Sequence, residues 1–223
     1  MIEINKIIRS KRKTFALEIS DDARLIIRSP KRASVKEIHK IMNKNKLWIR
    51  KKQELARQKY LKTKKKEFVN SEEFLYLGEV YILFMVDNPE IPLTNKNKTF
   101  MLARECIDNA REVFIQWYKE QAFRIISERA AWYSSISGLR YNKVSITNAH
   151  KRWGSCSPKE NLNFSMRLIM APLRVIDYVV VHEIAHIEEK NHSKRFWNKV
   201  KTMLPDYAQR KKWLNENGYL LFI

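Results

Sequence analysis

Apolar and polar positions along the chain follow two different periods, which separate strands from helices. Segments with period-two alternation predict β-strands over residues 15–19, 24–27, 74–86, 99–102, 144–147 and 162–165. The first two flank Asp21 and Asp22, so we expect a hairpin there. A Pro- and Asn-rich loop over 87–97 separates the strands of 74–86 and 99–102.

Helical periodicity predicts five helices, at about 36–66, 107–136, 172–190, 193–203 and 206–216, before an apolar tail at 219–223. Ser34 and Glu37 form the pattern of a capping box ahead of the first helix. Gly138 ends the second helix, and Pro172 opens the third. The order of strands, basic helix, strands, helix, strands and helices predicts an α+β fold rather than alternating βαβ units.

Composition adds a strong positive charge to this picture. The 223 residues contain 44 Lys and Arg against 24 Asp and Glu, a formal net charge of +20. Residues 1–104 hold 25 basic and 12 acidic residues, and 13 basic against two acidic residues lie in 36–66. We therefore divide the chain into a basic α+β region, 1–104, and a second region, 105–223. Polyanions are the expected partners, and the 36–66 helix is a candidate for non-specific DNA or RNA contact.

Several classes of protein are excluded by composition. Only four glycines occur, and none belongs to a P-loop or a dinucleotide-binding pattern. Two cysteines do not make a disulfide framework, and the amino terminus lacks the apolar stretch of a secretory signal. The longest apolar run, 80–86, has seven residues, too few to cross a membrane. We expect a soluble cytoplasmic protein with no membrane association, whose oligomeric state the sequence leaves open.

The helix opened by Pro172 carries the sequence H-E-I-A-H at 182–186. Residues four apart lie on one helix face, so His182 and His186 can bind one metal ion while Glu183 projects beside them. Zn²⁺ accepts imidazole nitrogen in tetrahedral geometry and needs a third ligand when it is catalytic. His192 is the candidate third ligand, with Asn191 in a left-handed conformation turning the chain and Ser193 capping the next helix. Glu188 and Glu189 are the next candidates for the third ligand.

This constellation predicts hydrolysis by a zinc-activated water. Zinc lowers the pKa of its water to about 7, and Glu183 accepts the proton as general base and passes it to the leaving group. The group that stabilises the oxyanion stays open among Tyr178, Arg152 and His150.

At these residues the chain resembles the YgjP-like zinc metallopeptidases, relatives of the SprT-like proteins. The matching blocks span most of the chain and include L-G-E-V-Y at 77–81, R-W-G-S-C-S at 152–157, D-Y-V-V-V-H-E at 177–183 and N-H-S at 191–193. The resemblance implies a zincin-like fold, with zinc held by His182, His186 and His192 and with Glu183 as general base. It also implies that 1–104 and the catalytic region 105–223 form one family module.

The segment before the last predicted strand is a candidate substrate-binding edge. In zincin-like folds an edge strand near the metal can bind an extended peptide through backbone hydrogen bonds. We therefore expect Arg152, Trp153, Gly154 and Ser155 to line the cleft. Cys156 is expected to be a buried free thiol rather than a ligand.

Three functions compete at this stage. A zinc metallopeptidase acting on proteins or peptides is favoured, because H-E-x-x-H is most familiar in peptide hydrolysis. A metal-dependent phosphohydrolase, such as a pyrophosphatase acting on nucleotides, uses the same activated water. A basic nucleic-acid-binding protein with a structural metal is the third, although a structural site has no need for Glu183.

Overall fold

The structure is a computed structural model that describes residues 2–20, 22–62 and 65–223. The chain forms two compact units, Met1–Lys64 and Lys65–Ile223. The division lies earlier than the predicted one after residue 104. The strands between residues 73 and 103 share a hydrophobic core with the helices that follow them, which places them in the second unit.

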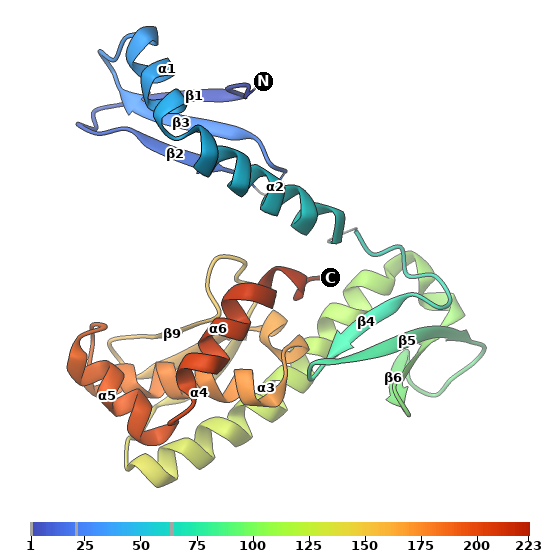
Figure 1. Cartoon of the computed structure of the whole chain (residues 1–223). Helices are drawn as coiled ribbons and strands as arrows, with labels where there is room; N and C mark the ends of the chain where they lie inside the picture. The colour runs from blue at the N-terminus through green and yellow to red at the C-terminus, as the bar shows by residue number, and fades with distance from the viewer. Residues whose placement is uncertain (1, 21, 63–64) are drawn as a thin grey trace. The chain divides into compact units, whose positions relative to one another are not determined.

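The amino-terminal unit is a three-stranded sheet with two helices (Figure 1). Its strands are β1 (Lys6–Ser10), β2 (Ala16–Ile19) and β3 (Leu25–Pro30), in the order β1-β3-β2. β2 and β3 form the predicted antiparallel hairpin, although Asp21 lies outside the described residues. β1, which was not predicted, pairs parallel with β3. Leu25, Ile27, Ile38 and Ile49 form the core of this unit.

The predicted basic helix is two helices, α1 (Val35–Lys44) and α2 (Lys46–Lys62); residues 63 and 64 lie outside the described part. The capping box is confirmed, since the Ser34 hydroxyl accepts from the Glu37 N–H and the Glu37 carboxylate accepts from the Ser34 N–H. The division falls at Asn45, whose side-chain amide donates to the Ile41 carbonyl at 2.8 Å. An asparagine side chain that donates to the carbonyl four residues earlier competes with the backbone and interrupts a helix that charge and periodicity alone would continue.

The second unit begins with a four-stranded sheet in the order β4-β5-β7-β6. Its strands are β4 (Glu73–Tyr76), β5 (Glu79–Val86), β6 (Leu93–Lys96) and β7 (Thr99–Ala103). The predicted strand 74–86 is therefore a hairpin, because Leu77 and Gly78 both have positive φ, as a type I′ turn requires. β6 lies in the predicted 87–97 loop, paired with β7 through a turn at Asn97 and Lys98, which also have positive φ.

The Leu77–Gly78 turn contacts the start of the third predicted helix. Gly78 donates its N–H to the Met170 carbonyl at 3.1 Å. A Cβ on Gly78 would lie 2.6 Å from Cγ of Pro172, so glycine is required for this close approach. The turn thereby fixes the point where the next helix enters the core.

A long helix and a second sheet complete the support for the site. The 3₁₀ helix η1 (Arg104–Asn109) leads into α3 (Ala110–Ser137), which ends at Gly138 in the left-handed conformation, as predicted. The second sheet has the order β8-β10-β9, so β9 is an edge strand. Its strands are β8 (Lys143–Thr147), β9 (Gly154–Cys156) and β10 (Asn161–Ser165), followed by the 3₁₀ helix η2 (Met166–Met170).

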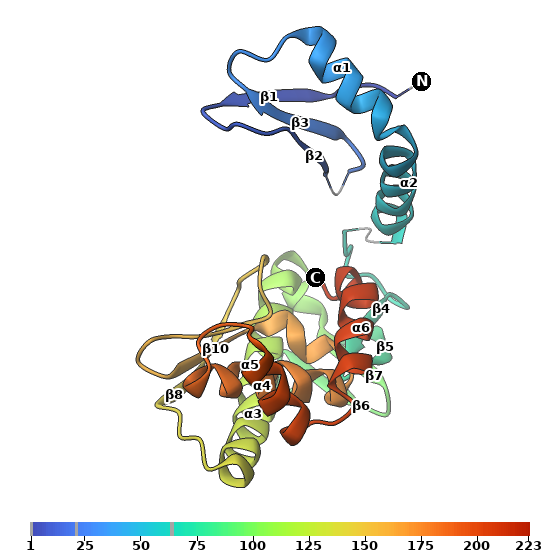
Figure 2. The ribbon, with the colours of Figure 1, turned by 60° about the vertical axis from the view of Figure 1, so that its left-hand side comes forward.

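The final elements are α4 (Leu173–Glu188), α5 (Lys194–Met203), α6 (Tyr207–Asn217) and the 3₁₀ helix η3 (Gly218–Leu220). α4 packs against α3, α5, α6 and β9, and the views in Figures 1 and 2 show it between α3 and α6. The α+β fold is confirmed. Among the described residues, no helix combines the length and the apolar character needed to span a membrane.

A buried carboxylate holds three of these helices together. Asp177 on α4 accepts from Arg129 on α3 through both of its oxygens, at 2.6 and 3.1 Å. Arg210 on α6 lies 3.5 Å from the same carboxylate and donates to the Arg174 carbonyl. Because a bidentate arginine–carboxylate pair fixes orientation as well as distance, the Arg129–Asp177 pair orients α3 against α4. Arg210 links α6 to the same carboxylate.

Candidate metal centre

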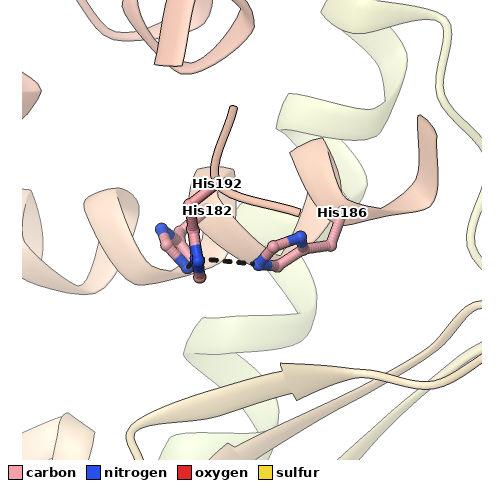
Figure 3. A group of neighbouring side chains, drawn as sticks. All are labelled: His182, His186 and His192. Carbon is pink, nitrogen blue, oxygen red and sulfur yellow. Dashed lines mark hydrogen bonds between the residues drawn. The ribbon is translucent and has the colours of Figure 1, made fainter. Parts of the chain in front are cut away.

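Three imidazoles from α4 and the loop after it converge on one point (Figure 3). His182 and His186 are four residues apart on α4, and His192 follows the helix. His192 Nε2 lies 3.0 Å from His182 Nε2 and 3.2 Å from His186 Nε2. The structure thus brings together the three ligands expected from the sequence.

The donor set fits a divalent transition-metal ion. Two nitrogens that bind one tetrahedral ion at about 2.0–2.1 Å lie about 3.4 Å apart, close to the observed separations. Three neutral nitrogens facing one another need a cation or a proton between them, because their lone pairs repel. Imidazole nitrogen suits Zn²⁺ among the common biological ions.

The Nδ1 atoms of His186 and His182 differ in their hydrogen bonding. Nδ1 of His186 lies 2.9 Å from the Glu189 carbonyl oxygen. A carbonyl only accepts, so Nδ1 of His186 carries the proton and its Nε2 keeps a lone pair for a metal. Nδ1 of His182 is buried without a hydrogen-bond partner in the described part of the chain.

The turn that returns His192 differs from the predicted one. α4 ends at Glu188, and Glu189 leaves it in an extended conformation. Asn191 does not have positive φ; its side-chain oxygen instead accepts from the Ser193 N–H at 3.1 Å. Ser193 caps α5, as predicted, by accepting from the Phe196 N–H.

Aromatic rings hold His192 from behind. The Trp197 ring stacks on His192 with centroids 5.8 Å apart and an interplanar angle of 23°. Tyr207 also stacks on Trp197, with centroids 5.4 Å apart and an interplanar angle of 20°. A ring held in this way has little rotational freedom, which prepares His192 for metal binding.

Electrostatics favour the neutral form of His182 and His192. Burial, followed by the neighbouring imidazoles and Lys211, lowers the pKa of His182 to about 3. The same causes lower the pKa of His192. Neutral imidazole is the form that binds metal, so the lowered pKa values of these two rings favour metal binding.

Glu183 is buried beside the three histidines. Burial raises its pKa to about 8, while the charge of Arg152 and the backbone N–H of Cys156 oppose this rise. A cation bound to the histidines would also oppose the rise and lower the pKa of Glu183, because a nearby positive charge favours the ionised carboxylate. Gly154 packs directly on this side chain, since a Cβ there would lie 2.6 Å from Oε1 of Glu183.

β9 presents its free edge toward this carboxylate. Trp153 O accepts from Ser165 N, and Ser157 N donates to Asn161 O, so alternate residues of the segment face β10. The N–H and C=O groups of Gly154 and Cys156 therefore face away from β10. The Cys156 N–H is used by Glu183, which leaves the Gly154 groups for a ligand.

A pocket of about 220 Å³ adjoins the metal centre. Trp153, Gly154, Tyr178, Val179, His182, Glu183, Lys211, Leu214 and Asn215 line it. Of the predicted substrate-binding residues, Trp153 and Gly154 lie here. Arg152 is exposed and acts on Glu183 through its charge, whereas Ser155 pairs with Asn163 on β10.

The structure also locates the candidate oxyanion-stabilising residues and Cys156. Among the oxyanion candidates, Tyr178 lines the pocket, while His150 is exposed and its carbonyl accepts from Arg167. Cys156 is a half-buried free thiol whose pKa is raised by burial.

Sequence reasoning missed the residues that surround the ligands. Trp197 follows Phe196 in the sequence, but no sequence pattern predicts that its ring stacks on His192. Lys211 is one of 44 basic residues and carries no motif. Both approach the site only through the packing of α5 and α6 against α4.

The known proteins that resemble this chain are metallopeptidases. The chain has a partial structural likeness to the metallopeptidase zymogen of Pyrococcus abyssi abylysin, with 17% identity, a TM-score of 0.37, and coverage of 41% of this chain and 93% of that chain. No curated protein matches the sequence. The family profile described as YgjP-like, metallopeptidase domain, matches residues 13–217, nearly the whole chain. The protein therefore belongs to the YgjP-like metallopeptidase family.

Proposed function

We propose that this protein is a zinc-dependent metallopeptidase that hydrolyses peptide bonds, with Glu183 as general base. The observation that carries the proposal is the convergence of three imidazole nitrogens beside a buried carboxylate. His182, His186 and His192 would hold the ion. The family is one of metal-dependent peptidases in general, and the proposal adds zinc as the ion and Glu183 as the base.

The protein's own groups move the proton and orient the substrate. A zinc ion held here supplies a Lewis acid that polarises a carbonyl and lowers the pKa of a water to about 7. The Glu183 carboxylate accepts a proton from that water and delivers it to the leaving amine nitrogen. The Cys156 N–H and the close contact with Gly154 keep this carboxylate in one position.

The edge of β9 is the proposed substrate-binding strand. An extended peptide can pair with the outward N–H and C=O of Gly154 and lie beside the metal centre. Trp153 lines the pocket next to this edge. Tyr178, whose pKa burial raises to about 12, keeps its hydroxyl proton and can donate to a developing oxyanion.

A paired assay tests the proposal. Zinc-loaded protein is given casein in one reaction and nucleoside triphosphates in another, and each rate is compared with Glu183→Gln. We expect casein cleavage that falls by about 10²–10⁴-fold in the variant. Triphosphate turnover lost in the variant, with casein untouched, would establish the phosphohydrolase instead. No turnover of either substrate would leave a structural metal site.

A second role concerns the basic helices. Exposed lysines and arginines cover the described part of α1 and α2: Lys36, Lys40, Lys44, Lys46, Arg50, Lys51, Lys52 and Arg57. We propose that they contact nucleic acid through phosphates without reading bases. Single-stranded DNA should bind at low salt and dissociate as salt rises; absence of binding at low salt would exclude this role.

The cellular location is a further part of the proposal. Cys106 and Cys156 are both free thiols. This supports action in a reducing compartment, which we take to be the cytoplasm.

A further inference from the structure

The pocket beside the metal centre has one cationic wall. Lys211 and Asn215, one turn apart on α6, line this wall, and Leu214 from the same helix and Val179 from α4 add apolar surface to the pocket. Asn215 is exposed and Lys211 is half-buried. A group that enters this pocket therefore meets an ammonium and an amide at the edge of an apolar surface.

Lys211 differs from its neighbours in having no carboxylate partner. On α6, Arg210 pairs with Asp206 and Asp177, and Lys212 lies 3.9 Å from Glu216. On α5, Lys199 pairs with Glu188 of α4. Within the described ranges, no carboxylate oxygen lies within 4.0 Å of Lys211 Nζ. The acidic groups of these helices are thus engaged elsewhere.

The position of the Lys211 ammonium is fixed by aromatic packing. Its Nζ lies 4.1 Å from the centroid of the Trp197 ring, which also stacks on His192. Cation–π contact with an indole face holds an ammonium without neutralising its charge. The charge is felt at the metal ligands, since it contributes to the lowered pKa values of His182 and His192.

The Lys211 ammonium lies beside a site for a divalent cation, and two positive charges near each other repel. Binding of an anion between them would offset this repulsion. Arg152 adds a second positive charge on the Glu183 side. The protein part of the pocket offers one carboxylate, Glu183, which is committed to the reaction centre. A substrate carrying its own negative charge would complete the charge balance of the site.

We propose that Lys211 is a specificity-determining residue that binds a carboxylate of the peptide substrate next to the scissile bond. This inference rests on the proposed peptidase function and names its substrate class, acidic peptides. A carboxylate matches this wall better than a phosphate, because the one ammonium that lines the pocket balances a single negative charge, whereas a phosphate group carries about −1.5 to −2 at pH 7. The carboxylate can belong to an Asp or Glu side chain or to a free carboxy terminus.

The test uses three fluorescein-labelled peptides that share one otherwise uncharged sequence. The first has an internal Asp and an amidated carboxy terminus, the second has Asn at that position with the amide, and the third has Asn with a free carboxylate. Binding to zinc-loaded Glu183→Gln protein is followed by fluorescence anisotropy, which needs no turnover. Cleavage of the same peptides by otherwise wild-type protein gives kcat/KM.

The matched variants are Lys211→Met, Lys211→Arg and Lys212→Met. Lys212 is the adjacent exposed residue on α6, so its variant makes the same change of charge outside the pocket. A charged hydrogen bond in a partly desolvated pocket corresponds to about a tenfold preference. We expect the Asp peptide or the free-carboxylate peptide to bind about tenfold more tightly than the neutral one. Lys211→Met should remove this preference, and Lys211→Arg and Lys212→Met should keep it.

The outcomes separate this inference from the proposed function. Equal binding of all three peptides, or an unchanged preference in Lys211→Met, would overturn the carboxylate site. An equal fall for all three peptides in Lys211→Met would also overturn it and assign Lys211 to packing or oxyanion stabilisation. If no peptide is cleaved but the binding preference and its loss in Lys211→Met are seen, the carboxylate site stands and the peptidase function fails.

Discussion

Replacing Gly154 by alanine tests whether the contact between β9 and Glu183 is needed for catalysis. The added Cβ would lie 2.6, 2.7 and 2.9 Å from Oε1, Cγ and Cδ of Glu183, closer than side chains approach in folded proteins. Gly154 is not in the left-handed region, so alanine brings no backbone strain. Either Glu183 or the β9 edge must therefore move.

The magnitude follows from these contacts. Overpacking of a rigid site costs about 1–3 kcal/mol of stability. Displacing a catalytic group by about 1 Å lowers the rate by about 10²-fold. Because the three atoms nearest the new methyl group all belong to Glu183, zinc content should stay at the wild-type level.

Casein hydrolysis, zinc content and thermal denaturation measure the three effects separately. Gly138→Ala is the matched control: its Cβ would meet nothing within 4 Å, but its φ of +70° disfavours alanine. It should lower stability by about 1 kcal/mol and leave activity intact. Full activity of Gly154→Ala, with stability equal to wild type, would refute the account of how Glu183 is positioned.

Three further predictions concern the ligands and their surroundings. His192→Ala should weaken zinc binding by more than about 100-fold in a chelator competition, since loss of a ligand exceeds loss of an outer partner; wild-type zinc affinity would place the third ligand elsewhere. Trp197→Ala should weaken zinc by about 10–100-fold through loss of the ring behind His192, and an unchanged affinity would assign Trp197 to packing alone. In metal-free protein, the pKa of Glu183 is about 8 in the folded state, against an ordinary value of 4.5. Between these two pH values the folded state keeps the Glu183 proton and the unfolded state loses it. The free energy of unfolding therefore falls as the pH rises from 4.5 to 8. Glu183→Gln should remove this fall, worth at most ~5 kcal/mol, from thermal denaturation curves, whereas parallel profiles for the two proteins would show that Glu183 is not buried as described.

Local patterns predicted much of the fold because their causes are local. The capping box, Gly138 and Pro172 each set a helix boundary through nearby backbone geometry, and these boundaries are where the sequence placed them. The break at Asn45 was missed because apolar residues at helical spacing occur on both sides of it. β6 was missed because turn residues dominate 87–97, and its pairing with β7 is a contact that a local pattern does not reveal.

The proximity of the three histidines was predictable for a similar reason. Spacing on one helix places His182 beside His186, and only a short turn separates them from His192. The mechanism of that turn was not predicted correctly, since Glu189 rather than Asn191 begins the reversal. Lys211 and the Trp197 stack depend on how α5 and α6 dock, partly through the buried Asp177, and no sequence period encodes that docking.

X-ray absorption at the zinc edge, combined with metal analysis of the purified protein, tests the central claim most directly. We expect one zinc ion per chain with three imidazole nitrogens at about 2.0–2.1 Å and an oxygen as the remaining ligand. Failure to bind zinc, or a sulfur ligand at about 2.3 Å that implicates Cys156, would contradict it.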